Sequence, residues 1–82
     1  MRLPRDISGR DLARTLKAYG YKLTRQTGSH MRLTTSENGE HHVTVPAHGE
    51  LRVGTLAGVL DEVAFHFGVS REDVVERLFG RG

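Results

Sequence analysis

The spacing of apolar residues changes along the chain and predicts where helices give way to strands. A stripe at helical spacing predicts a first helix over residues 8–20, with the stripe facing the core. This stripe consists of Leu12, Leu16 and Tyr19. Ser8 and Asp11 have the spacing of a capping box, and Gly20 can adopt the left-handed conformation that ends a helix.

After this helix the apolar period becomes two residues, which is typical of β-strands with one buried face. The expected strands cover residues 21–26, 30–34 and 41–45. Gly28-Ser29 separates the first two strands, and Asn38-Gly39 is a strong hairpin signal between the second and the third. Because both connections are short, we expect an antiparallel meander.

Two further helices are expected, over residues 54–67 and 70–79. The apolar stripe of the first of them consists of Leu56, Val59, Leu60, Val63 and Phe67. Gly68 ends this helix, and Ser70 with Asp73 repeats the capping signal. The order α-β-β-β-α, followed by a short extra helix, predicts an α+β fold with a three-stranded antiparallel sheet and helices on one face.

Strict alternation assigns each strand residue to one face of the sheet. The residues expected to face the helices are Leu23, Met31, Leu33, Val43 and Val45. Their neighbours, expected on the outward face, are Lys22, Thr24, Gln26, His30, Arg32, Thr34, His42 and Thr44. The outward face then has four side chains that can carry positive charge and no carboxylate, which suits the phosphate oxygens of a nucleic acid.

Length and composition narrow the classes of function. The chain has 82 residues and a mass of 9.1 kDa, which predicts a single domain over residues 1–82 with its core in residues 7–68. Cysteine is absent, which excludes disulfides, thiolate metal sites and cysteine nucleophiles. No apolar run is long enough for a membrane span, and the N-terminus lacks a secretory apolar segment, so we expect a cytoplasmic protein.

Positive charge is concentrated in the N-terminal part of the chain. Residues 1–35 carry eight Lys and Arg against two acidic residues, whereas residues 36–82 carry four against eight. A basic half on a small domain is typical of a protein that binds a polyanion. An unevenly charged, solvated surface would give the same pattern.

His30 is the strongest candidate for chemistry because it opens a strand directly after the Gly28-Ser29 turn. A side chain in that position can be held rigidly and still face water. Imidazole titrates near neutral pH, and RNA supplies its own nucleophile in the 2′-hydroxyl beside the scissile phosphate. His30 can therefore serve as a general base or acid in RNA cleavage. The alternative is that His30 is an ordinary polar residue of a strand.

The other histidines are weaker candidates. His41 and His42 are adjacent, so a strand directs them to opposite faces. His48 lies in a loop, where it can reach a phosphate or bond to the backbone, and His66 is expected to be structural or solvated. The chain has no metal-ligand spacing, hydrolase elbow or nucleotide-binding glycine pattern, so we expect neither a metal nor a cofactor.

Four short motifs occur in order between Ser8 and about Ser70. They are Leu-x₃-Leu-x₂-Tyr-Gly-Tyr in the first helix and turn, Arg25-Gln26-Thr27-Gly28-Ser29-His30, Val43-Thr44-Val45-Pro46-Ala47-His48 and Val53-Gly54-Thr55-Leu56. Together they resemble the motifs of the HicA toxins, the small mRNA interferases of HicA–HicB toxin–antitoxin pairs. The resemblance implies a fold like the double-stranded RNA-binding domain.

The resemblance also implies ribosome-independent endonucleolytic cleavage of mRNA, with the histidine of the Gly-Ser-His motif, here His30, as the catalytic residue. Residues expected to bind RNA are Lys22, Arg25, Gly28, Ser29, Arg32 and His48. Gly28 and Ser29 are expected to shape the turn that presents His30. The implied partners are mRNA and a HicB-type antitoxin that covers this face, with no membrane partner. We expect the toxin alone to be a monomer.

The chain departs from the family pattern in two places. Many relatives carry a second histidine or an aromatic residue after the Gly-Ser-His motif, where this chain has Met31 and Leu33. Both are expected on the inward side, so the departure should alter packing rather than chemistry. The helix over residues 70–79 is an extension that could strengthen the domain or add antitoxin contacts.

Two other functions are compatible with the same residues. A non-catalytic RNA-binding module would use the basic face without any reactivity of His30. A protein-interaction module would instead use the acidic C-terminal half of the chain as its binding surface.

Overall fold

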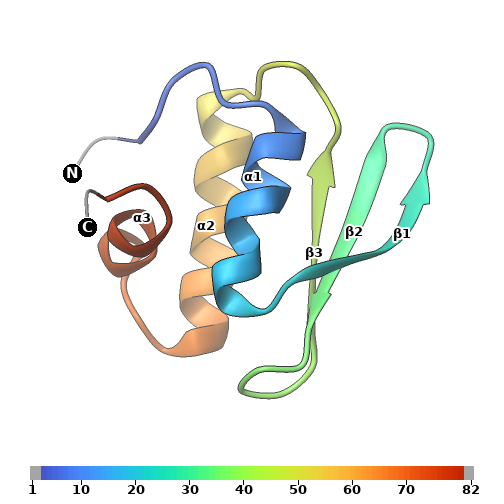
Figure 1. The fold of residues 1–82 in the computed structure, drawn as a ribbon. Coiled ribbons are helices and arrows are strands. Elements are labelled where there is room, and N and C mark those ends of the chain that lie inside the picture. Colours follow the sequence, from blue (N-terminus) through green and yellow to red (C-terminus); the bar gives the residue numbers. More distant parts are fainter. Residues whose placement is uncertain (1–2, 81–82) are drawn as a thin grey trace.

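The computed structural model describes residues 3–80, so both ends of the domain expected over residues 1–82 lie outside the described part. The elements in chain order are α1 (Gly9–Thr15), the 3-10 helix η1 (Leu16–Tyr19), β1 (Lys22–Thr27), β2 (His30–Thr35), β3 (His41–Pro46), α2 (Val53–Phe67) and α3 (Arg71–Phe79). This order confirms the predicted α+β layout with an extra C-terminal helix (Figure 1). Within residues 3–80, no helix has the length and apolar character that a membrane span requires.

The first predicted helix is present but divides into two parts. The Asp11 N–H donates a 3.0 Å hydrogen bond to the Ser8 hydroxyl, which confirms the predicted N-terminal cap. The second half tightens into η1, and Gly20 ends it in the left-handed conformation with φ of 83°. Both parts bury the predicted apolar stripe, which is Leu12, Leu16 and Tyr19.

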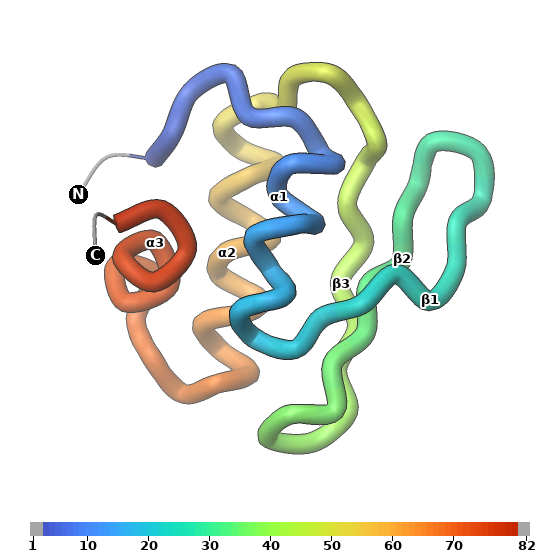
Figure 2. The backbone as a smooth tube through the Cα atoms, in the orientation of Figure 1, coloured from blue at the N-terminus to red at the C-terminus, as the bar shows by residue number. Residues whose placement is uncertain are grey.

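The sheet is the predicted antiparallel meander, in the order β1-β2-β3. Met31, Leu33, Val43 and Val45 are buried against the helices, as expected. Leu23 also faces inward, as expected, but 53% of this residue is exposed. Leu23 lies opposite Leu33 on the inward side, but β1 is an edge strand, and the β1–β2 hairpin stands clear of the helices (Figure 2).

The helices lie on one side of the sheet and form two layers. Helices α1 and α2 lie next to the sheet, and α3 lies beyond them on the side away from the strands (Figure 1). The buried residues of α2 include the predicted stripe members Leu56, Val59, Leu60 and Val63. No helix among the described residues covers the other face of the sheet, which is therefore open to solvent.

Helix α3 is fixed by a cap and by one arginine. Ser70 and Asp73 form the predicted capping box at its start. Near its end, Arg77 donates a 2.8 Å hydrogen bond to the Ala18 carbonyl, and its guanidinium lies 4.5 Å from the centre of the Tyr19 ring. These contacts join α3 to η1 and keep it away from the sheet.

Gly9 allows the start of α1 to lie directly against the end of β3. Its N–H donates a 2.9 Å hydrogen bond to the His48 carbonyl, and a Cβ at this position would overlap the Pro46 carbonyl. Glycine is therefore required here for space, even though it weakens the first turn of a helix. The contact fixes the loop that carries His48.

A cluster of rings ties the β2–β3 turn to the end of α2. The His41 and His66 rings stack with centroids 4.4 Å apart, and the Tyr21 hydroxyl lies 2.8 Å from His41 Nδ1. His66 Nε2 lies 2.9 Å from the Glu37 carbonyl oxygen and 3.0 Å from that of Gly39. His66 thus has the structural role that was one of its two expected states.

The environment of this cluster favours the neutral forms of His41 and Tyr21. Burial lowers the pKa of His41, and the adjacent His66 ring lowers it further, against a smaller opposing effect of Glu62. Burial, with Glu62 nearby, raises the pKa of Tyr21 to about 12. Tyr21 therefore stays protonated, and its hydrogen bond with His41 Nδ1 joins two side chains whose neutral forms are favoured.

Replacing Gly9 with Ala should destabilise the protein by about 1–3 kcal/mol, because the new methyl group must displace the backbone at Pro46. Gly58 in α2 is the matched control, since no atom lies within contact distance of its missing Cβ. Gly58→Ala should stabilise by about 0.5–1 kcal/mol through helix propensity. Urea unfolding measures both free energies, and changes of the same sign would contradict the docking of α1 through Gly9.

The His41–His66 stack should make stability depend on pH. The pKa of His41 is lowered in the folded state, so its contribution is complete above its ordinary pKa of 6.5 and is lost as the pH falls through the folded value. Thermal unfolding should give a lower Tm at mildly acidic pH than at neutral pH. His41→Asn removes the titrating ring and should reduce this difference; an undiminished difference would assign the effect to other groups.

Candidate functional site

A β-bulge in β1 decides which of its side chains face outward. Leu23 pairs with Leu33, but the next pair is Arg25 with Arg32, so Thr24 is an extra residue in the strand. Directly opposed residues of an antiparallel pair lie on the same face. Arg25 therefore joins Arg32 on the outward face, where strict alternation did not place it.

The same bulge corrects the prediction for Gln26. Gln26 pairs with Met31, whose side chain is buried, so it lies on the inward side of β1 rather than on the outward face. Its amide Nε2 donates a 3.1 Å hydrogen bond to the Gly28 carbonyl at the turn. Thr27 takes the outward position opposite His30.

The outward face consists of three rows of side chains that cross the strands. The row nearest the β1–β2 turn is Thr27, His30 and Pro46. The middle row is Arg25, Arg32 and Thr44. The third row is Lys22, Thr34 and His42. Successive rows are two residues apart along β2, or about 7 Å. Each row contains at least one positively charged or protonatable side chain, so these groups repeat at that interval across the face.

His30 occupies the exposed corner of this face. Its backbone is paired on both sides, with Thr27 in β1 and with Pro46 in β3. The turn before it depends on Gly28, whose φ of 58° is unfavourable for other residues. The residue is exposed, and within the part of the chain that the structure describes its ring has no hydrogen-bond partner. The imidazole is thus anchored through its backbone and free to meet a ligand.

Ser29 and His48 lie at the same end of the sheet as His30. The Ser29 carbonyl accepts a 2.6 Å hydrogen bond from the Ala47 N–H, which joins the turn to the segment after β3. His48 follows Ala47 and is exposed. The predicted site residues from two separate motifs are therefore brought together at this corner.

A chain of hydrogen bonds crosses the third row from β3 to β1. His42 Nε2 lies 3.1 Å from Glu40 Oε2, and His42 Nδ1 lies 2.7 Å from Thr34 Oγ1. Thr34 Oγ1 lies 2.7 Å from Thr24 Oγ1. Thr24 Oγ1 also donates a 3.3 Å hydrogen bond to the Arg32 carbonyl. This chain holds the bulge residue and so positions Arg25 beside it.

Glu40 is an unexpected residue here, because the sequence pattern predicts no carboxylate on this face. It lies outside the strands, just before β3, and only the fold brings it to the edge of the third row. His42 and His30 are both on the outward face, but they are four residues apart along the ladder, or about 13 Å. One phosphate cannot contact both rings.

Uncompensated positive charge remains on the outward face. Lys22, Arg25 and Arg32 form no ion pair with any residue in the range 3–80. Asp61, away from this face, is engaged by Arg71, whose two hydrogen bonds at 2.7 and 2.8 Å lower the pKa of the carboxyl. The face can therefore bind an anion without first breaking a salt bridge.

The arrangement suits a phosphodiester chain better than a small cofactor. Charges in successive rows can contact successive phosphates, and an exposed imidazole stands at one end. The three rows contain no Phe, Tyr or Trp on which bases could stack. Among residues 3–80, no three His, Asp or Glu side chains are grouped so that they could hold a metal ion.

The family model described as HicA toxin of bacterial toxin–antitoxin systems matches residues 9–64, which include all three strands and most of α2. No curated protein and no solved structure matches the chain.

Thr34→Val should break the hydrogen-bond chain and cost about 0.5–1.5 kcal/mol of stability. It should also shift the backbone amide signals of Thr24 and Arg25 in ¹H–¹⁵N correlation spectra, because the bulge loses its side-chain support. Thr34→Ser retains the hydroxyl and is the control that should leave both signals near their original positions. Unmoved Thr24 and Arg25 signals in the valine variant would show that the bulge forms without this chain.

Proposed function

Because the chain belongs to the HicA toxin family of bacterial toxin–antitoxin systems, we propose that this toxin is an endoribonuclease that cleaves mRNA without the ribosome. The observation that carries the proposal is the position of His30. Its ring is exposed at the end of a paired strand, in the row next to the unpaired Arg25 and Arg32. A proton-transfer group with two unpaired cations in the next row can supply both general acid–base catalysis and charge stabilisation for RNA cleavage.

The proposed reaction uses the nucleophile that RNA carries. His30 removes the proton of a 2′-hydroxyl, and the oxygen attacks the adjacent phosphorus. The new O2′–P bond forms as the P–O5′ bond breaks, and the 5′-oxygen leaves with a proton from the imidazolium or from water. The products are a 2′,3′-cyclic phosphate and a 5′-hydroxyl end. A positioned general base contributes about 10²–10⁴-fold to such a step.

The neighbouring cations have separate roles in this proposal. Arg32 and Arg25, one row away from His30, stabilise the additional negative charge of the phosphorane and hold the phosphate. Lys22, in the third row, binds a phosphate further along the strand. Gly28 and Ser29 shape the turn, and His48 approaches the RNA from the loop after β3. No metal is needed for activation of the nucleophile.

RNA binding without cleavage is the second candidate function. It is favoured by one observation, that within residues 3–80 no carboxylate or carbonyl orients the His30 ring as the bases of many enzymes are oriented. The two functions share the basic face and the same salt dependence of RNA affinity. They differ in whether a purified protein shortens a long transcript.

His30→Ala should lower the rate of transcript cleavage by about 10²-fold or more while RNA affinity changes little. The assay uses a long transcript with excess EDTA present, and analysis of the new ends should find 2′,3′-cyclic phosphates. A transcript carrying 2′-deoxy nucleotides should resist cleavage. If the His30→Ala variant cleaves the transcript at the original rate, His30 is not part of the mechanism. If the unmodified protein leaves the transcript intact, RNA binding without cleavage is the remaining function.

A further inference from the structure

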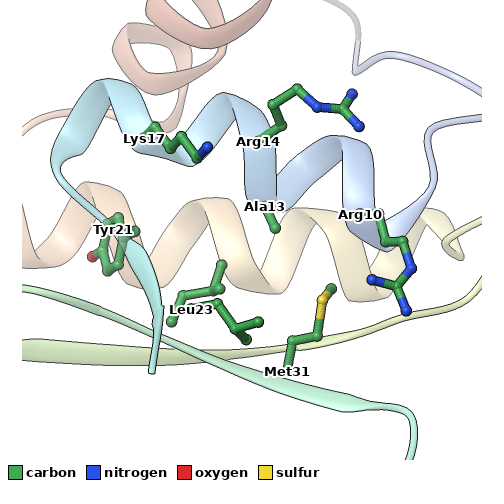
Figure 3. A pocket seen from close by; sticks show the side chains of 8 residues that line it. Arg10, Ala13, Arg14, Lys17, Tyr21, Leu23 and Met31 are labelled. Carbon is green, nitrogen blue, oxygen red and sulfur yellow. The ribbon is translucent and has the colours of Figure 1, made fainter. Parts of the chain in front are cut away.

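A groove lies between α1 and the inward side of the β1–β2 hairpin, on the opposite face of the sheet from His30. Its volume is about 250 Å³, and its floor includes Leu23 and Met31, with Ala13 on the helix side (Figure 3). A second hollow of about 500 Å³ shares Lys17, Tyr21 and Leu23 with the first, so the two adjoin. The groove exists because β1 extends beyond the cover of the helices.

The walls of this groove are basic. Arg10 projects from the start of α1 and Lys17 from η1, and Arg14 lies between them on the same wall but points away from the sheet (Figure 3). Neither Arg10 nor Lys17 forms an ion pair with any residue from 3 to 80. No acidic residue lines either hollow. A ligand with carboxylates at matching positions would therefore meet two cations that have no competing partner.

The floor of the groove is apolar and is not fully covered. Leu23 is 53% exposed, although it lies on the face of the sheet where the other apolar strand residues are buried. Phosphates need charge but gain nothing from an apolar floor, whereas a protein segment can bury its own apolar side chains there. The combination of floor and walls thus fits a protein segment better than an RNA backbone.

From this complementarity we propose that the groove binds a segment of the partner antitoxin that carries both carboxylates and apolar side chains. The apolar side chains would cover Leu23 and Ala13, and the carboxylates would pair with Arg10 and Lys17. The proposal depends on the toxin–antitoxin family of the chain and not on cleavage of RNA by His30. Contact is made through side chains, since the bulge at Thr24 interrupts the regular edge that an added strand would need.

Binding in the groove would also bring the partner close to the proposed RNA surface. Lys22 lines the second hollow and belongs to the third row of the outward face. A partner that fills the groove therefore reaches around the edge of β1 to a cation that we assign to RNA. One segment could in this way anchor the antitoxin on one face while its remainder covers the other.

The test uses three labelled peptides of equal length and measures their binding by fluorescence anisotropy. One alternates Glu and Leu, one alternates Glu and Ser, and one alternates Lys and Leu. The Glu-Leu peptide should bind at least about tenfold more tightly than either of the others. Leu23→Asp and Lys17→Glu should each weaken that binding about tenfold, and the effect of Lys17→Glu should diminish at high salt.

Arg52→Glu is the charge-matched control, because Arg52 is exposed before α2 and lines neither hollow. It should leave Glu-Leu binding unchanged, and circular dichroism should show every variant folded. Equal binding of all three peptides, or equal binding by the variants and the control, would overturn the proposal. Loss of single-stranded RNA binding in Lys17→Glu with no effect on the peptide would assign the groove to RNA instead.

The outcome is separable from that of the proposed function. Arg32→Glu should impair RNA cleavage but not Glu-Leu binding, because Arg32 lies on the outward face. One outcome is that the unmodified protein leaves a transcript intact and yet binds the Glu-Leu peptide, with weaker binding in Leu23→Asp and Lys17→Glu. In that case the groove assignment stands and the nuclease assignment fails. If the protein cleaves the transcript but does not bind the peptide selectively, the nuclease assignment stands and the groove assignment fails.

Discussion

The central strand of the sheet, β2, constrains the rest of the structure. Met31 and Leu33 are buried between the sheet and the helices, so the alternating residues His30, Arg32 and Thr34 must face the opposite way. Pairing with β1 and β3 then fixes each of these side chains relative to its neighbours. A shift of one residue would bury the arginine and expose two large apolar side chains, at a cost of several kcal/mol.

Because β2 has a fixed register, the two neighbouring strands decide the chemistry of the open face. The bulge at Thr24 brings Arg25 opposite Arg32, and the hydrogen bond between Thr24 and Thr34 supports the bulge. On the other side, Gly9 fixes the loop after β3 against α1 through Pro46 and His48, and the hydrogen bond from Ala47 to Ser29 joins that loop to the turn before His30. The helices thus influence the site through the ends of the strands, without covering it.

Much of this architecture follows from the sequence, because the spacing of apolar residues and the helix caps are set by residues that are close together in the chain. The alternation of Met31 with Leu33 predicted which face of β2 is buried, and the cap at Ser8 predicted where α1 begins. The bulge was not predictable, because Leu23-Thr24-Arg25 has no period that distinguishes it from a regular strand. The contact of Glu40 with His42, the exposure of Leu23 and the groove beside it arise from tertiary placement, which no local pattern encodes.

The most direct measurement tests whether RNA binds the open face with its scissile phosphate at His30. The protein is titrated with a 2′-O-methyl RNA, which cannot be cleaved through its 2′-oxygen. The titration is followed in ¹H–¹⁵N spectra of the uniformly labelled protein. We predict that the largest shifts appear at the amides of Arg25, His30 and Arg32, and that the His30 ring signals move with them. Shifts centred on α3 or on the groove beside α1, with an unaffected His30, would contradict this placement of the RNA.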